Sequence, residues 1–171
     1  MIPIPDPLHP AIVHFPIVLI FIGTVAAVAA IFIRRWHLSL LAAILLAGGA
    51  VGAFAATWSG DREEEIAGKL PPQTKQILDN HEEWGERTRN IAFAAALLAV
   101  AATAATHFPK TAKALSFATA LVAAASMYAT AVTGHYGGLL VYKSGVGVKT
   151  AAGNTPFPPT EGRTRQEESE H

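Results

Sequence analysis

Hydrophobic residues along this chain gather in four blocks that are separated by polar connections. The blocks cover residues 12–33, 38–58, 91–106 and 114–133. A helix rises about 1.5 Å per residue, so a block of about 20 residues crosses a hydrocarbon core of about 30 Å. The first, second and fourth blocks have that length, whereas the third needs its polar edges, Arg89, Asn90 and His107. The pattern predicts an all-α integral membrane protein, a four-helix bundle that runs up, down, up and down.

The domain organisation is predicted from a pair of prolines before the third apolar block and from the composition of the C-terminal segment. Residues 1–149 should form the four-helix transmembrane domain, with an outer loop helix at about 72–88. Pro71 and Pro72 mark the start of this loop helix, which we expect to run on into the third apolar block. Residues 150–171 are rich in Pro, Gly, Thr and charge, and are predicted to be a mobile polar tail.

Two local breaks are expected within the helices. Pro16 has no backbone N–H, so it predicts a kink beside His14 in the first helix. After the fourth block, the glycines of segment 133–138 should stop the helix and let the backbone turn sharply. Residues 139–142, followed by residues 145–148, are then expected to form a short strand-like cover.

Composition supports a membrane setting and excludes several cofactor types. Of 171 residues, 51% are hydrophobic and only 15% are charged, too few charges to cover a soluble domain of this size. The formal net charge is zero, which gives no electrostatic reason to expect nucleic acid as a partner. The chain has no cysteine, so it cannot supply disulfides, thiolate zinc sites, iron–sulfur ligands or a covalent c-type haem link.

The charges between the blocks predict the orientation in the membrane. The short connections carry Arg34 and Arg35 in one case and Lys110 and Lys113 in the other. The long central loop, residues 59–88, contains clustered Asp and Glu. Because short basic loops stay in the cytoplasm, both termini and the central loop are expected outside.

Three short motifs occur in order along the chain. The first helix opens with Leu8-His9-Pro10 and then Val13-His14-Phe15-Pro16, and the fourth block is followed by Gly134-His135-Tyr136-Gly137-Gly138. In this order they resemble a family of bacterial predicted inner-membrane proteins catalogued as domain of unknown function 2231, over about residues 8–148. The resemblance implies a four-helix protein of the bacterial inner (cytoplasmic) membrane. It implies no settled function.

Histidines supply the main functional clue. His9, His14, His81 and His135 fall at block ends that alternating passes bring to one outer rim. An imidazole is unfavourable beside lipid and is a good ligand for a metal or a haem iron. We therefore expect these four to hold one or two haem b groups, since a low-spin haem needs two axial ligands that facing helices can supply. His9 and His14 lie about 140° apart around a helix, so each is expected to pair with a partner drawn from His81 and His135.

Four further side chains near this rim are candidates for the same site. Arg87 and Arg89 can bind haem propionates bidentately, or can simply extend to the membrane surface. Trp84 and Tyr136 can flank a porphyrin, or can belong to an interfacial aromatic belt.

The function predicted from these residues is that of a small b-type cytochrome. It would transfer electrons between a membrane quinone pool or a partner subunit and an external carrier, and any enzymatic activity would be that of an oxidoreductase. One alternative is a non-haem metal-binding protein that adds Asp61, Glu63 or Glu82 to the histidines. Another is a cofactor-free structural or assembly subunit, in a homo-oligomer or a larger complex. A transporter is disfavoured, because no charged residue lies inside an apolar block.

A faint repeat is also present. Histidines stand near the starts of the first and third helices, and Ser59-Gly60 and Thr133-Gly134 stand near the ends of the second and fourth. This spacing hints at pseudo-symmetry within the bundle.

Overall fold

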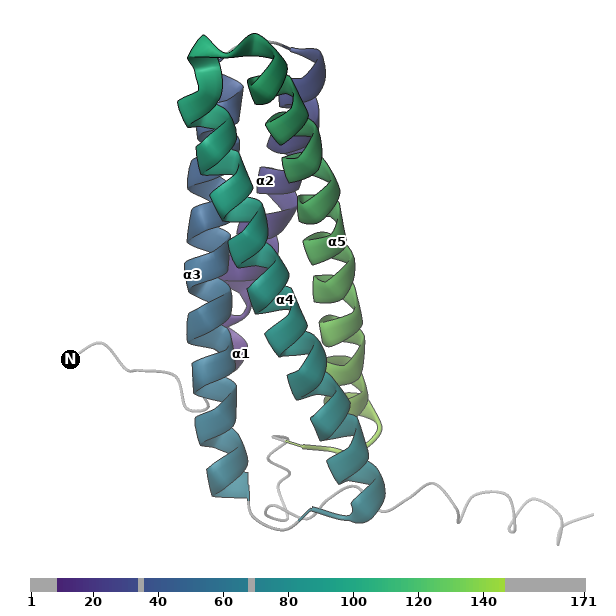
Figure 1. Cartoon of the computed structure of the whole chain (residues 1–171). Coiled ribbons are helices and arrows are strands. Elements are labelled where there is room, and N and C mark those ends of the chain that lie inside the picture. The colour runs from purple at the N-terminus through teal and green to yellow at the C-terminus, as the bar shows by residue number, and fades with distance from the viewer. Residues whose placement is uncertain (1–8, 34–35, 68–69, 147–171) are drawn as a thin grey trace, which may run out of the picture.

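The regular structure of this chain is entirely helical in the residues that the computed structural model describes, 9–33, 36–67 and 70–146. Its elements are α1 (His9–Ile12), α2 (His14–Phe32), α3 (Trp36–Ala67), α4 (Pro72–Ala104), the 3-10 helix η1 (Ala105–His107) and α5 (Pro109–Tyr142). The long helices run up, down, up and down, and α5 packs against both α4 and α2 to close the bundle (Figure 1). The predicted all-α four-helix bundle is confirmed, and the predicted tail at 150–171 lies outside the described residues.

Among residues 9–33, 36–67 and 70–146, three helical segments are long and apolar enough to cross a membrane. They are His9–Phe32, His37–Arg62 and Pro109–Tyr142. The apolar part of α4 is not among them, because Arg87 and Arg89 shorten it, as the polar edges of the third block suggested. Large apolar side chains point outward from all four long helices, among them Val18, Phe21, Phe54, Leu97, Val100, Phe117 and Leu121. Such a surface suits lipid and would be unfavourable in water.

The interior of the bundle is made mainly of small residues. Most buried side chains are alanines, and Ile20 and Leu46 are the largest fully buried apolar ones. Helices α2 and α3 approach so closely that a Cβ added at Gly49 would lie 2.8 Å from Ile20 Cγ1. A Cβ added at Gly52 would lie 3.2 Å from Pro16 Cδ. Close backbone approach at small residues therefore holds the helices together, as in other membrane bundles.

The hydrogen-bond pattern of the first helix has the gap that Pro16 predicts, while the Val13 backbone keeps helical angles (φ −60°, ψ −28°) and the kink itself stays a prediction. The helix is interrupted at Val13, between α1 and α2 and directly before His14. Pro16 causes this interruption, because it has no N–H to donate to the carbonyl of Ile12 four residues earlier. The next donor, the N–H of Ile17, bonds the Val13 carbonyl at 3.4 Å.

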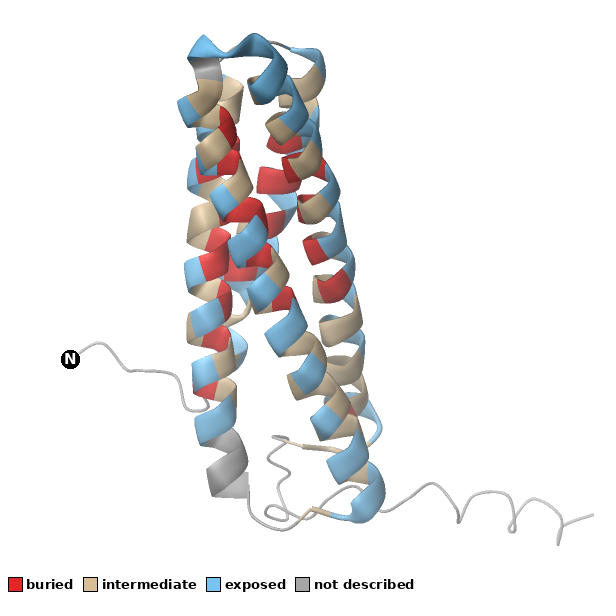
Figure 2. Ribbon diagram, in the orientation of Figure 1, coloured by how far each residue is buried: buried red, intermediate tan, exposed pale blue. Residues whose placement is uncertain are grey.

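Helix α4 joins the outer loop helix to the third apolar block. It begins at Pro72, directly after Pro71, as the two prolines predict, and it runs without a break to Ala104. Its 33 residues span about 50 Å at about 1.5 Å per residue. Buried residues are concentrated in the half of the bundle near η1 (Figure 2), and in α4 the first of them is Thr88. Fewer of the described residues are buried in the opposite half of the bundle.

The end of α5 differs from the prediction. The helix continues through the glycines of segment 133–138 to Tyr142, so residues 139–142 are helical and form no strand. A glycine inside a helix costs only about 1 kcal/mol relative to alanine, which packing against neighbouring helices offsets. The chain turns instead at Gly145, whose φ of 65° is a left-handed conformation that suits glycine. There the N–H groups of Gly145 and Val146 donate to carbonyls of the last helical turn.

We expect Gly49→Ala to destabilise the bundle by about 1–3 kcal/mol. The new methyl group would overlap Ile20 Cγ1 and lie 3.2 Å from the Ile20 backbone nitrogen, so two helices would have to separate. Thermal unfolding in detergent measures the effect. Gly134→Ala is the control, since a Cβ at Gly134 meets nothing within 4 Å. Equal melting temperatures for the two variants would contradict tight packing at Gly49.

Candidate histidine site

Two of the four candidate histidines meet at the end of the bundle opposite η1 (Figure 1). The ring centroids of His9 in α1 and His81 in α4 lie 6.1 Å apart, and the ring planes are at 86° to each other. Both side chains are half-buried. The two residues are called the histidine pair below.

The backbone of α3 orients the His9 ring. His9 Nδ1 lies 2.9 Å from the carbonyl oxygen of Ala56 and 3.1 Å from Ser59 Oγ. The Ser59 hydroxyl itself donates to the same carbonyl at 2.9 Å. A carbonyl oxygen can only accept, so we assign the proton of the neutral ring to Nδ1. The nitrogen that carries the lone pair is then Nε2.

The backbone of α5 orients His81 in the same manner. His81 Nδ1 donates to the carbonyl oxygen of Thr133 at 2.9 Å. The Thr133 hydroxyl donates to the Ala129 carbonyl at 2.9 Å and lies 3.1 Å from the hydroxyl of Thr88. These bonds tie α4 to α5 directly beside the ring.

The environment of His81, in the polar first half of α4, favours its neutral form. Burial lowers the pKa of the imidazole, and a charge on His9 would lower it further. The hydrogen bond to the Thr133 carbonyl raises the pKa, but its effect is smaller than that of burial. The neutral imidazole is the form that ligates metals.

A glycine lies against each ring of the pair. A Cβ added at Gly60 would lie 3.3 Å from His9 Cε1, and one added at Gly137 would lie 3.1 Å from His81 Cε1. Either methyl group would press on the imidazole and require it to shift. From the sequence, Gly137 was interpreted as part of a helix stop, so its contact with His81 was missed.

The other two candidate histidines lie on the surface. His14 is exposed, and its Nδ1 lies 2.8 Å from the carbonyl oxygen of Pro10 in its own helix turn. His135 is exposed, and its ring packs on Tyr136 with centroids 5.6 Å apart. Within residues 9–146, as far as the structure describes them, no three His, Asp or Glu side chains are grouped to hold a metal ion. The structure thus brings together one pair of histidines instead of four.

The two arginines predicted near the rim are engaged by carboxylates. Arg87 pairs with Glu83, and its guanidinium lies over the Trp84 ring, 4.8 Å from the centroid. Arg89 Nη2 lies 3.4 Å from Glu86 Oε1. Both are pairs within α4.

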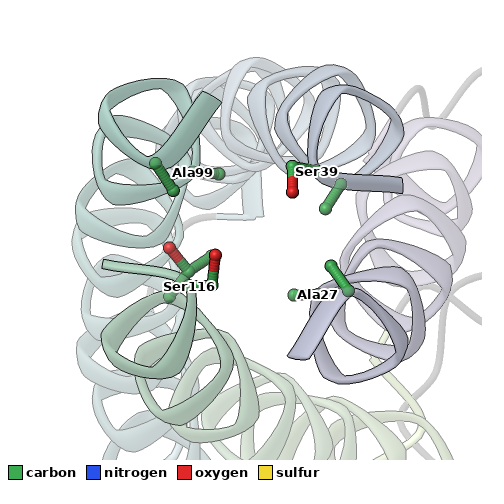
Figure 3. A pocket seen from close by; sticks show the side chains of 8 residues that line it. Ala27, Ser39, Ala99 and Ser116 are labelled. Carbon is green, nitrogen blue, oxygen red and sulfur yellow. The ribbon is translucent and has the colours of Figure 1, made fainter. Parts of the chain in front are cut away.

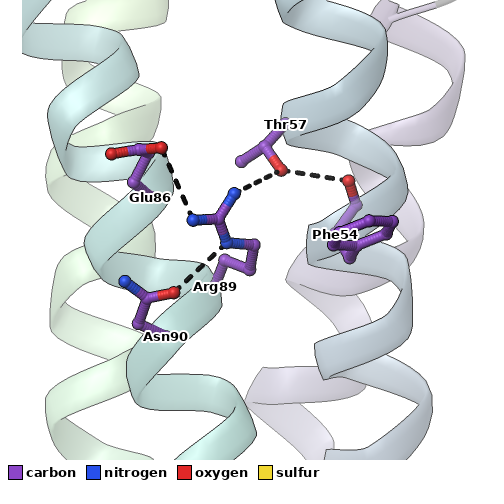
Figure 4. Close-up of polar contacts among 5 residues, drawn as sticks. All are labelled: Phe54, Thr57, Glu86, Arg89 and Asn90. Atoms are coloured by element: carbon purple, nitrogen blue, oxygen red, sulfur yellow. Dashed lines mark hydrogen bonds and ion pairs between the residues drawn. The ribbon is translucent and has the colours of Figure 1, made fainter.

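Arg89 also connects two helices. Its Nη1 donates to Thr57 Oγ1 of α3 at 3.4 Å, and its Nε donates to Asn90 Oδ1 at 3.2 Å (Figure 4). The Thr57 hydroxyl donates in turn to the Phe54 carbonyl at 3.0 Å. The guanidinium therefore joins α4 to α3 where the polar half of α4 meets its apolar half.

The predicted aromatic flanks have other neighbours. The Trp84 ring packs on Tyr128 of α5, with centroids 6.2 Å apart and planes at 80°. Tyr136 packs on His135. Of the acidic side chains considered as alternative ligands, Asp61 is exposed and Glu82 is half-buried beside His81 in sequence, while the Glu63 side chain lies outside the described part.

Comparison with known proteins places the chain in a family. A family model described as predicted membrane protein (DUF2231) matches residues 5–150, which include every helix described above. The chain belongs to this family. None of the curated proteins or solved structures compared with this DUF2231 protein matches it significantly. Family membership and the three candidate spans together make it a membrane protein.

Acid should destabilise this DUF2231 protein through His81. Its pKa is lowered by folding, so between the folded pKa and the ordinary value of 6.5 the unfolded chain binds more protons. The free energy of unfolding should therefore fall as the pH drops below about 6.5. Thermal unfolding in detergent between about pH 8 and pH 5 measures this fall.

His81→Gln is the matched variant, because the amide cannot titrate in this range. Its free energy of unfolding should depend less on pH than that of the parent protein. Identical pH slopes for the two proteins would contradict a destabilising protonation at His81.

Proposed function

We propose that this protein binds one haem b through the histidine pair and acts as a small membrane cytochrome. The observation that carries the proposal is the shared orientation of the two imidazoles. Each ring donates its Nδ1 proton to a backbone carbonyl, Ala56 for His9 and Thr133 for His81. Metal-ligating histidines characteristically make such a bond, which fixes the tautomer and raises the basicity of the ligating nitrogen.

The separation of the rings suits two ligands of one iron. A metal–imidazole bond is about 2 Å long, and the ring centroid lies about 1 Å beyond the nitrogen, so imidazoles on opposite sides of one ion have centroids about 6 Å apart. The measured centroid separation is 6.1 Å. Facing helices of a bundle supply two such ligands readily.

The number of ligands favours haem over a bare metal ion. Zinc and copper sites in proteins use three or four side chains. No group of three or more suitable side chains occurs in the described parts of the bundle. A porphyrin would supply four nitrogens of its own, so His9 and His81 would be the two ligands that the protein has to provide.

The position of the pair suggests an electron-transfer role at the membrane surface. His9 contacts Ala56 and Ser59, which lie near the end of the candidate span His37–Arg62. A bound haem would supply one-electron redox chemistry, and the chain would supply the ligands and partial exclusion of water. The electrons would pass between a membrane quinone pool or a partner subunit and a carrier outside.

Arg87 and Arg89 remain the candidates for the haem propionates. Their guanidinium groups already bind the carboxylates of Glu83 and Glu86. Binding a propionate would therefore exchange one carboxylate for another, at exposed glutamates that water can solvate after the exchange.

Absorption spectroscopy of the purified protein, supplied with haem, tests the cytochrome proposal. We expect a Soret band and a sharp α band on reduction, as two axial histidines produce a low-spin iron. His9→Ala and His81→Ala should each abolish this low-spin spectrum. His14→Ala and His135→Ala should keep it, because both side chains are exposed, and they contact the Pro10 carbonyl and the Tyr136 ring respectively.

Two outcomes would overturn the assignment. One is a folded parent protein that takes up no haem, and the other is an unchanged low-spin spectrum in both His9→Ala and His81→Ala. Elemental analysis on the same samples would show whether zinc or copper is bound instead.

We further propose that both termini lie outside the inner membrane of a bacterial cell. The basic residues Lys110 and Lys113 follow η1, at the opposite end of the bundle from the histidine pair. Short basic connections favour the cytoplasm, which places the pair on the outer side. Alkaline phosphatase fused at the C-terminus should then be active, and a fluorescent reporter that matures only in the cytoplasm should stay dark. The reverse result would invert the orientation.

A further inference from the structure

The two imidazoles are held by the same local arrangement, which we call the imidazole seat. Each seat consists of a backbone carbonyl that accepts the Nδ1 hydrogen bond and a glycine four residues later on the same helix. The seat of His9 is Ala56 and Gly60 on α3, and the seat of His81 is Thr133 and Gly137 on α5.

Helix geometry explains why a glycine belongs at this position. Residues four apart lie one above the other on a helix face, and each Cα–Cβ bond tilts toward the N-terminus. The Cβ of the later residue would therefore project over the carbonyl of the earlier one. Without that Cβ, an imidazole from the neighbouring helix can reach the second lone pair of the carbonyl oxygen.

The two halves of the bundle correspond beyond the seats. His9 and His81 are 72 positions apart, and the same shift superposes buried positions of α2 on buried positions of α4. The pairs are Pro16 with Thr88, Ile20 with Ala92, Gly23 with Ala95, Thr24 with Ala96, and Ala27 with Ala99.

A second shift relates α3 to α5. Gly60 and Gly137 are 77 positions apart, as are Ala56 and Thr133, so both members of the seat follow one offset. The same offset connects further pairs of buried residues: Ala42 with Thr119, Ala43 with Ala120, Leu46 with Ala123, and Gly49 with Ser126. The two offsets differ because the loops within the two hairpins differ in length.

The residues that line a small cavity near the other end of the bundle are related by the same two offsets in residue number. Its eight lining residues form four equivalent pairs: Ala27 with Ala99, Ala30 with Ala102, Ser39 with Ser116, and Ala42 with Thr119. Seen along the bundle, Ala27 lies diagonally opposite Ala99, and Ser39 lies diagonally opposite Ser116 (Figure 3). A twofold axis along the bundle produces this arrangement.

We infer that the chain is a tandem repeat of one helical hairpin about a pseudo-twofold axis, and that Gly60 and Gly137 are positioning residues that hold His9 and His81 as equivalent ligands of one site. The first hairpin comprises α1, α2 and α3, and the second comprises α4 and α5. The inference rests on the proposed function for the identity of the ligand, whereas the seats themselves are testable without it. A haem iron suits such a site, because its two axial positions are equivalent.

Nitrogen-15 NMR of labelled histidine in the purified protein, without added haem, tests the seats. Gly60→Ala should shift the Nδ1 signal of His9, and Gly137→Ala should shift that of His81, since each new methyl group would move one ring slightly and so change its hydrogen bond to the carbonyl. Each variant should leave the other histidine almost unchanged. Gly134→Ala and Gly138→Ala are the matched controls on α5, because a Cβ at either position meets nothing within 4 Å.

Haem titration of the same variants supplies a second measurement. Gly60→Ala and Gly137→Ala should weaken haem binding by similar factors, up to about tenfold, since the supporting hydrogen bond is strained and full loss of such a bond costs about tenfold to a hundredfold. The controls should bind haem as the parent protein does. Should an alanine variant fail to fold, His9→Gln and His81→Gln replace it and should lower the melting temperature equally.

The outcomes separate this inference from the proposed function. Paired shifts of the histidine signals in a protein that takes up no haem would support the symmetric seats and overturn the cytochrome proposal. A shift at His81 but none at His9 would overturn the equivalence of the two halves. If Gly134→Ala and Gly138→Ala shifted the histidine signals as much as Gly60→Ala and Gly137→Ala do, the positioning role of Gly60 and Gly137 would be contradicted.

Discussion

The close approach of helix backbones is the constraint on which the rest of this structure depends. Lipid gives helices no hydrophobic reason to associate, so contact must come from packing of small residues and from hydrogen bonds across the bundle. At Gly49 the approach allows Ile20 to pack against the α3 backbone, and at Gly60 it allows an imidazole to reach a carbonyl. One physical device therefore builds both the core and the histidine site. In the core, the absence of a Cβ at Gly49 lets an apolar side chain pack against the backbone. In the seat, the absence of a Cβ at Gly60 lets an imidazole reach a carbonyl oxygen.

The hydrogen bond inside each seat also explains how a histidine is accommodated near the membrane. A polar ring removed from water must find a partner, and the backbone of a helix offers only the second lone pair of its carbonyls. His9 and His81 use that lone pair on neighbouring helices, and Thr24 does the same deeper in the bundle, where its hydroxyl lies 3.2 Å from the Ala123 carbonyl. These bonds fix which nitrogen of the ring carries the proton. The chemistry available at the site follows from this requirement for a partner.

Features of the fold that depend on local chemistry could be predicted from the sequence. The lengths of the apolar blocks predicted the helices. The missing N–H of Pro16 predicted the gap in the hydrogen-bond pattern at Val13. The rotation of about 140° between residues five apart also anticipated that His9 and His14 do not share a site. What could not be predicted depends on contacts between helices. His9 meets His81 because α1 packs on α3, next to α4. The contact between Gly137 and His81 likewise depends on how α4 and α5 pack together.

The two hairpins differ in a way that bears on what the histidine pair is for. In the core, Ile20 corresponds to Ala92 and Leu46 to Ala123, so large residues in one half have small equivalents in the other. All four belong to one packed cluster, and cores tolerate such exchanges when the total volume is kept. At the histidine site, by contrast, His9 corresponds to His81 and Gly60 to Gly137, while Ala56 and Thr133, which differ in side chain, both contribute a backbone carbonyl. If packing were the only requirement, one half could have an apolar residue in place of its histidine. Burying an apolar side chain costs less free energy than burying an imidazole. The presence of a histidine and a glycine at corresponding positions of both halves therefore agrees with the proposal that one ligand uses both imidazoles.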